Sequence, residues 1–126
     1  MPDERIQRAL ERDRTIDITT IGRKSGQPRR IEIWFYRAGG RFYLSGRPGR
    51  RAWAANLLAN PEFTFHLKES VRADLPARAR PVAGPGERRA IFTAILKDLR
   101  MERELEAWIS GSPLMEVEFI QEGSTP

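Results

Sequence analysis

The sequence predicts a small, mainly β domain in which an antiparallel barrel carries helices at its periphery. Three observations indicate this fold class: short runs alternate apolar and polar residues with a period of two, glycine-rich turns join the first three runs, and a helical pattern separates the third run from the fourth. The 126 residues, 40% hydrophobic and 31% charged, suffice for one compact core and not for two. We therefore expect a single domain over residues 1–126.

The first half of the chain contains one helix and three strands. Residues 3–13 place apolar side chains at helical spacing among charges, which predicts a short amphipathic helix. Residues 15–22 alternate isoleucine with polar residues and are rich in β-branched side chains, as is typical of a strand. A turn at 22–29, a second strand at 30–40 ending in a Gly-Gly hairpin signal, and a third strand at 41–46 follow.

The second half combines helices with further strands. A helix is predicted from near Gly49 to Pro61, because proline cannot continue a helix. Strands are expected at 62–68 and 71–82, and Pro76 confines the second of them to a sheet edge or a bulge. An amphipathic helix at 84–99, a weaker helical stretch at 102–110, a last strand at 114–121 and a polar tail complete the chain.

Composition narrows the classes of function. Lysine and arginine number 22 against 17 acidic residues, a formal charge of +5, so we expect an anionic partner: phosphate, carboxylate, nucleic acid or a membrane surface. The chain has no cysteine and one histidine, His66, which argues against disulfides, a thiol nucleophile and a Cys/His zinc site, and we predict no metal. A charged N-terminus without an apolar core, and the lack of any run of about 18 apolar residues, predict a cytoplasmic protein.

The turn GRKSGQPR is more cationic and more glycine-rich than a hairpin requires. Its two glycines let successive backbone amides point into one hollow, and the Ser25 hydroxyl adds a donor there. Arg23, Lys24 and Arg29 add charged donors around the same hollow, an arrangement that suits a phosphate. The alternative is a solvated cationic hairpin without a ligand.

A second site-like stretch is YLSGRPGRRAWAANLLANP. The third strand ends in a cationic glycine loop, Ser45-Gly46-Arg47-Pro48-Gly49, which leads into Trp53 and Asn56 one helical turn apart. An aromatic face, an amide and backbone amides would converge there. In the alternative interpretation, Trp53 anchors the core and Asn56 lies on the helix surface.

These two stretches resemble the family of deazaflavin-dependent nitroreductases and quinone reductases. The order GRKSGQPR, a strand ending in Ser-Gly, then W-x-x-N-L-x-x-N-P carries the resemblance, which covers residues 15–82. Proteins of this family have the split β-barrel fold of FMN-binding, pyridoxamine phosphate oxidase-like proteins. They bind coenzyme F420, an 8-hydroxy-5-deazaflavin with a phosphate and a polyglutamate tail.

The resemblance implies roles for residues at matching positions. Those expected to hold the phosphate and the anionic tail are Arg23, Lys24, Ser25 and Gly26, with Arg29 or Arg30. Those expected to meet the deazaflavin ring are Ser45, Gly46 and Arg47, with Trp53 and Asn56 closing the pocket. Family members often carry a longer glycine-rich loop and a proline two residues before the tryptophan, where this chain has Arg51, so the ring side departs from the family pattern.

The resemblance implies an enzyme that transfers a hydride from reduced F420 to a quinone, an enone or a nitroaromatic compound. Ser45, Tyr43 and Tyr36 are the candidate donors to the oxygen that gains charge on the acceptor. A homodimer is expected by analogy with related flavoproteins, and a peripheral contact with the membrane would let the enzyme reach quinones.

Three alternatives remain open at this stage. The same barrel would also suit FMN, since a phosphate cradle does not distinguish two flavin-like cofactors. A non-catalytic module that binds nucleic acid or a lipid surface is a second alternative, but the aromatic residues do not interleave with the basic ones as stacking on bases requires, and we expect no nucleic acid partner. A family member that has lost its cofactor is the third.

Overall fold

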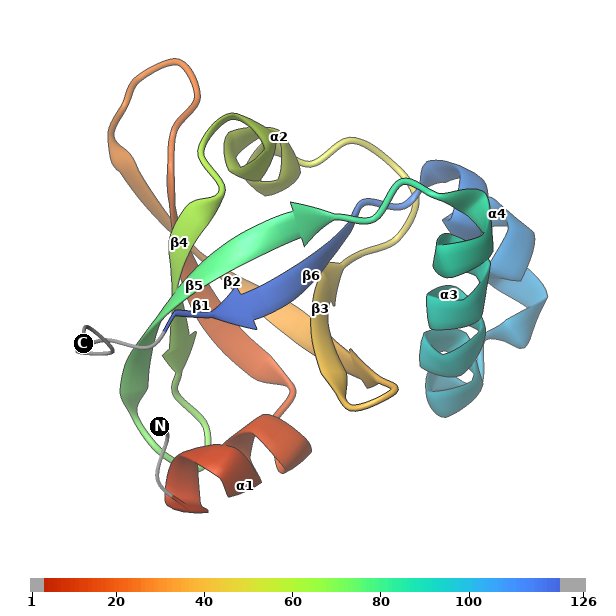
Figure 1. Cartoon of the computed structure of the whole chain (residues 1–126), viewed down its shortest axis with the longest axis horizontal. Helices are drawn as coiled ribbons and strands as arrows, with labels where there is room; N and C mark the ends of the chain where they lie inside the picture. Colours follow the sequence, from red (N-terminus) through yellow and green to blue (C-terminus); the bar gives the residue numbers. More distant parts are fainter. Residues whose placement is uncertain (1–3, 121–126) are drawn as a thin grey trace, which may run out of the picture.

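The computed structural model describes residues 4–120, which form a closed six-stranded antiparallel barrel with four α-helices around it (Figure 1). The strands run around the barrel in the order β1-β2-β3-β6-β5-β4, and β4 pairs with β1 to close it. The helices are α1 (Glu4–Arg12), α2 (Ala52–Ala59), α3 (Pro85–Leu99) and α4 (Leu105–Gly111), with a 3-10 turn, η1, at Glu102–Glu104. The strands are β1 (Thr15–Ile21), β2 (Pro28–Ala38), β3 (Arg41–Ser45), β4 (Glu62–Leu67), β5 (Ala73–Pro81) and β6 (Leu114–Phe119).

The period-two pattern decides which side chains fill the barrel. Successive side chains of a strand point to opposite faces, so every second residue turns inward. Ile16, Ile18, Phe35, Leu44 and Phe65 are completely buried in this interior cluster. The rings of Phe35 and Phe65 pack edge to face with their centroids 5.2 Å apart, a favoured arrangement for aromatic pairs.

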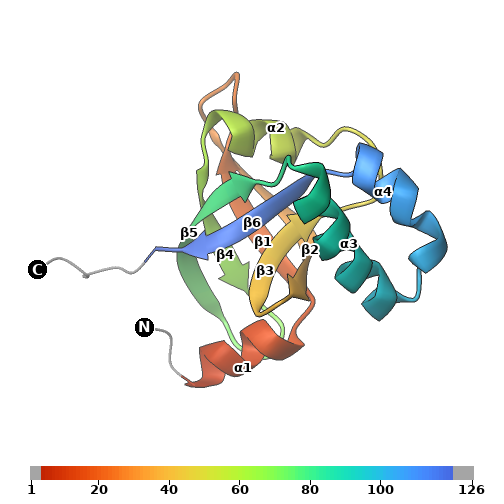
Figure 2. The same ribbon diagram turned by 45° about the vertical axis from the view of Figure 1, so that its right-hand side comes forward.

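The helices cover the barrel in three places (Figures 1 and 2). Helix α1 lies across one end, where Ala9 and Leu10 join the interior cluster, and α2 lies across the other end with Trp53 and Leu57. Helices α3 and α4 pack on the outer wall beside β2 and β3 and form a second cluster. The residues buried in this second cluster are Tyr43, Val82, Ile91, Phe92, Ile95, Leu96, Trp108 and Leu114.

The order and type of the predicted elements agree with the structure, but several boundaries differ, and two of these differences have a clear physical cause. Helix α2 begins at Ala52 and not near Gly49, because Gly49 has a φ of +134° and Arg51 is extended with a φ of −133°. Strand β2 begins at Pro28, two residues earlier than predicted, since the turn closes after the Gly22 amide donates to the Gln27 carbonyl at 2.9 Å. The predicted end of the last strand at Gln121, the polar tail and Asp3 lie outside the described residues.

Pro76 does not lie on an edge strand, because the closed barrel pairs β5 on both sides. The β5–β6 pairing ends at the pair Ala77 and Phe119, one residue before Pro76 is reached. The Pro76 carbonyl points towards β6 and accepts the Ile120 amide at 2.9 Å. In an antiparallel strand the N–H of a residue points to the same side as its carbonyl, so the N–H that proline lacks would also face β6, at the end of the β5–β6 pairing. The barrel thus tolerates proline at the end of a paired stretch.

Arg88 joins the outer helices to the barrel. From α3 its guanidinium donates to the carbonyls of Val82 at 2.9 Å, Ile109 at 2.9 Å and Ser112 at 2.6 Å, with a longer bond to Trp108 at 3.3 Å. Three of these carbonyls belong to the C-terminal end of α4 and the residue after it, where helical carbonyls lack partners in their own helix. The Arg88 side chain therefore joins the C-terminal end of α4 to Val82, the residue that follows β5.

We expect Arg88→Met to lower the free energy of unfolding by about 2 kcal/mol, because the buried carbonyls lose their donor. Urea unfolding followed by circular dichroism would measure it. The matched control is Arg89→Met, which removes an exposed ion pair with Glu106 on the same helix, and its unfolding midpoint should not change. Equal losses in both variants would contradict this role of Arg88.

Candidate functional site

The β1–β2 hairpin extends past the end of the barrel and lies beside α2 (Figure 1). Ile18 pairs with Ile31, and Thr20 pairs with Arg29, so these positions continue the inward-facing series beyond the barrel. The side of the hairpin that would face a barrel interior faces α2 instead. Ile31, which is 37% exposed, is the apolar floor of the space between them.

The turn itself has little steric freedom. A Cβ at Gly22 would lie 2.5 Å from the Ser25 Oγ, and Gly26 has a φ of +70°, so both positions favour glycine. The Ser25 Oγ accepts the Gln27 amide at 3.1 Å. The Ser25 hydroxyl therefore keeps its own hydrogen free to donate to a ligand.

Asn56 connects the turn to α2. Its side-chain Oδ1 accepts the backbone amide of Arg23 at 3.1 Å, and its Nδ2 donates to the Thr20 Oγ1 at 3.2 Å. The residue is 9% exposed, so both bonds are shielded from water and an unmade partner would be costly. Asn56 thus sets the distance between hairpin and helix.

A cavity of about 460 Å³, here called the hairpin pocket, opens between the hairpin and α2. It is lined by Thr20, Gly22, Arg23, Lys24, Ser25, Arg29, Ile31, Ala52, Trp53 and Asn56. Within residues 4–120, none of its three cations, Arg23, Lys24 and Arg29, has a carboxylate partner. Six of the predicted cofactor residues meet here, and the pocket combines positive charge with an indole ring.

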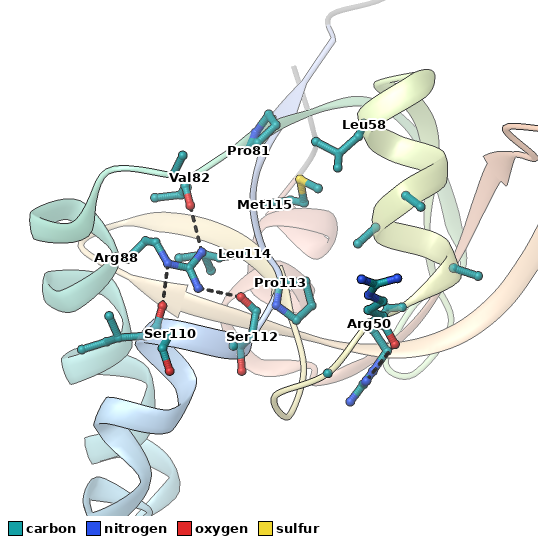
Figure 3. A pocket seen from close by; sticks show the side chains of 18 of the residues that line it. Arg50, Leu58, Pro81, Val82, Arg88, Ser110, Ser112, Pro113, Leu114 and Met115 are labelled. Carbon is teal, nitrogen blue, oxygen red and sulfur yellow. Dashed lines mark hydrogen bonds between the residues drawn. The ribbon is translucent and has the colours of Figure 1, made fainter.

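A larger cavity of about 1130 Å³, here called the α2 cleft, adjoins the hairpin pocket and shares Arg23 and Ala52 with it. Figure 3 looks into it between α2 on one side and α3 with α4 on the other. Leu58 and Met115 give it apolar surface, and Arg50 extends from the α2 side opposite Arg88. Its cationic rim therefore continues the charge of the hairpin pocket.

A third cavity of about 560 Å³, here called the aromatic pocket, lies on the outer face of β2 near the end of α3. Its lining residues are Arg14, Trp34, Tyr36, Arg47, Asp98, Leu99, Met101 and Trp108. The loop at residues 46–51 contributes Arg47 to this pocket and residues 49–51 to the α2 cleft. One loop thus forms part of the wall of both cavities.

The residues predicted to meet a ring or to donate a proton are dispersed. Ser45 is 2% exposed, and its hydroxyl donates to the Pro113 carbonyl at 2.7 Å. Tyr43 is 3% exposed beneath α3, where burial raises the pKa of its phenol. Neither residue lines any of the three cavities described, so their geometry gives no support to a donor role for Ser45 or Tyr43.

The other predicted residues separate into two groups. Tyr36 and Arg47 line the aromatic pocket, and burial raises the pKa of the Tyr36 phenol although Arg14 and Arg47 lower it. Gly26, Arg30 and Gly46 line none of the three cavities, and Arg30 is paired with Asp17 at 3.0 Å.

Sequence reasoning missed several lining residues. Thr20 lies two residues after the inward-facing Ile18, and Ile31 pairs with Ile18 across the hairpin, so both face the same side as Ile18. Strand alternation together with the hairpin register could therefore have identified them. No sequence signal distinguishes Trp34 from a strand aromatic that packs in the core, although 48% of it is exposed. Arg14 had no local signal, since its place depends on how α3 packs.

Comparisons with known proteins identify the family and the fold. The sequence profile of the F420H(2)-dependent quinone reductase family matches residues 3–109. The chain belongs to this family. It is therefore an F420-dependent oxidoreductase, and coenzyme F420 is its cofactor.

Similar solved structures show the fold. The conserved hypothetical protein Rv2991 from Mycobacterium tuberculosis superposes with a TM-score of 0.73 at 17% identity, over 96% of this chain and 82% of that one. A putative pyridoxamine 5'-phosphate oxidase from Listeria innocua gives 0.69 at 13% identity, over 92% and 91%. An F420-H2 dependent reductase, FDR-A, gives 0.59 at 19% identity, over 84% and 95%. The predicted split β-barrel is thereby confirmed.

The residues present fit such a cofactor. F420 carries a phosphate and several carboxylates, and the hairpin pocket offers cations without acidic partners in the described part of the chain. Among residues 4–120, no group of three or more histidine, aspartate or glutamate side chains converges as a metal site. In the same part of the chain, no helix is both long and apolar enough to cross a bilayer.

We expect Asn56→Ala to loosen the hairpin from α2. The Arg23 amide should exchange its hydrogen faster, and the free energy of unfolding should fall by about 1–2 kcal/mol, because two shielded polar groups lose their partner. Hydrogen exchange measured by NMR tests both. Asn60→Ala, at the end of the same helix, is the control and should leave the exchange rate of the Arg23 amide unchanged. Faster exchange of this amide in both variants would contradict the role of Asn56 in joining the hairpin to α2.

Proposed function

We propose that the hairpin pocket holds the phosphate and the first part of the anionic tail of F420. Arg23, Lys24 and Arg29 would neutralise these groups, and the Ser25 hydroxyl would donate to a phosphate oxygen. The observation that supports this most is that these three cations surround one pocket without a carboxylate partner in residues 4–120. Elsewhere on the barrel, arginines such as Arg30, Arg78 and Arg80 are paired with acids.

The deazaflavin ring would then lie against the loop at residues 46–51. This loop borders both the α2 cleft and the aromatic pocket, so a flat ring seated on it can reach an acceptor in the second cavity while its tail remains near the hairpin. Trp53 would pack against the ring end of the hairpin pocket. In this arrangement Asn56 has a positioning role, because its side chain bonds the Arg23 amide and Thr20.

The acceptor would occupy the aromatic pocket, where Trp34 presents a flat surface to a quinone, an enone or a nitroaromatic ring. Reduced F420 supplies a hydride when bound. The Tyr36 phenol, kept protonated by burial, would donate a hydrogen bond to the acceptor oxygen, and with solvent it would supply the proton that completes a two-electron reduction.

The two alternatives, an FMN-binding protein and a non-catalytic polyanion-binding module, explain fewer of the observations. FMN would suit a phosphate cradle equally, but the family profile favours the deazaflavin. A polyanion-binding module would spread its cations over an open face, whereas here the cations that lack acidic partners among residues 4–120 border two adjoining cavities. The homodimer, the cytoplasmic location and a peripheral membrane contact stay predictions.

We expect the purified protein to bind F420 and not FMN. Titration of each cofactor, followed by quenching of tryptophan fluorescence, measures this because Trp53 lines the hairpin pocket. Oxidation of reduced F420 by 2-methyl-1,4-naphthoquinone in the presence of the protein then tests the enzyme. Binding of FMN alone would contradict the cofactor assignment.

We expect Lys24→Ala to weaken F420 binding about tenfold, because a charge-assisted contact to an anionic oxygen is lost. The exposed turn position should leave the thermal midpoint unchanged. Lys97→Ala, which removes an exposed lysine from α3, is the charge-matched control. Equal weakening in the two variants would mean that net charge, and not the cradle, accounts for binding.

A further inference from the structure

We propose that the aromatic pocket selects planar acceptors that carry a negative charge, such as a ring carboxylate or an ionised hydroxyquinone. This inference rests on the proposed function only in treating the occupant as the acceptor. The pocket's own chemistry indicates the class of ligand, since its wall combines exposed aromatic surface with two arginines.

The first observation is the exposure of Trp34. The ring is 48% exposed on a strand whose neighbour Phe35 is completely buried, and the exposed surface borders the cavity. The guanidinium carbon of Arg14 lies 5.2 Å from the Trp34 ring centroid, within cation–π range. Leu99 and Met101 add apolar wall, so a flat apolar ligand body has a place to pack.

The second observation is that both arginines are held only loosely. Arg14 reaches Asp98 at 3.4 Å, and Arg47 reaches Glu104 at 3.4 Å, and both carboxylates are well exposed to solvent. Exposed pairs of this kind contribute little free energy. A ligand carboxylate in the pocket can therefore recruit either guanidinium at small cost.

One partner carboxylate and the backbone of one arginine have other bonds that keep the site in place. The Glu104 Oε1 accepts the Trp108 indole N–H at 3.2 Å, so this carboxylate stays anchored if Arg47 turns away. The Arg14 backbone amide donates to Glu69 at 3.1 Å, which fixes the start of β1 while the side chain is free to reorient. The frame of the pocket is thus independent of the two weak ion pairs.

The third observation is an available neutral donor. The Tyr36 hydroxyl has no hydrogen-bond partner within residues 4–120, and burial raises the pKa of its phenol, so it remains a donor at neutral pH. A planar ligand with an oxygen at one edge and an anionic group at another would satisfy Tyr36 and an arginine together. A neutral ligand would gain nothing from the arginines, which would keep their weak pairs with Asp98 and Glu104.

The experiment uses the full chain without cofactor, so that it does not depend on F420 binding. The protein is titrated with 2-naphthoate and with 2-naphthamide, which share a ring system and differ in charge. The indole N–H resonances of the three tryptophans are followed by NMR and are assigned with single Trp→Phe variants. We expect naphthoate to bind about tenfold more tightly, with changes at Trp34 and Trp108 and none at Trp53.

Two variants separate local charge from net charge. Arg47→Gln should weaken naphthoate about fivefold and leave naphthamide unchanged. Arg89→Gln, which alters net charge equally but lies in an exposed pair on α3, should alter neither ligand. This pattern would support the proposal.

Other outcomes would overturn it. Equal affinities of 2-naphthoate and 2-naphthamide for the unmodified chain would show that the pocket does not discriminate between charged and neutral ligands. Equal effects of the two variants would show a bulk electrostatic attraction, and resonance changes at Trp53 would place the anion in the hairpin pocket. A failure of F420 to bind in the separate titration would refute the cofactor assignment and leave these results as they stand.

Discussion

The amide side chain of Asn56 holds the β1–β2 hairpin against α2, and the binding surfaces of the molecule depend on that bridge. It fixes the positions of the Arg23 amide and the Thr20 hydroxyl relative to the helix, so the exposed cations of the turn border the pocket beside α2. The same helix carries Trp53, which closes the pocket from the other side. Because α2 also borders the larger cleft, one buried amide aligns the walls of two neighbouring cavities.

The basic residues of the barrel wall and those of the β1–β2 turn differ in whether they have acidic partners. Arginines on the barrel wall are paired with nearby acids, as Arg80 is with Glu116 on the adjacent strand β6 and with Glu87 in the first turn of α3. The cations of the turn have no acidic partners among the described residues, so an anionic ligand would not compete with a carboxylate for them. Part of the excess positive charge of the sequence therefore lies where a polyanion can bind.

The sequence predicted the barrel well because period-two alternation and turn residues are local signals that the fold keeps. The cationic side of the hairpin pocket was likewise predictable, since Arg23, Lys24, Ser25 and Arg29 belong to one turn and the turn geometry brings them together. Ser45 and Tyr43 show where this reasoning fails: their strand was placed correctly, but the packing of α3 and α4 buries the face on which they lie. Arg14 and Asp98 meet across 84 positions, which no local pattern encodes.

The three cavities draw on different parts of the chain. The hairpin pocket is made wholly from residues 20–56, whereas the aromatic pocket takes half of its lining from residues 98–108. Substitutions at residues 98–108 can consequently reshape the aromatic pocket while the hairpin pocket keeps all of its lining. Such separation would let a lineage vary one cavity through one short segment, and it offers the protein engineer a region to randomise without rebuilding the other cavity.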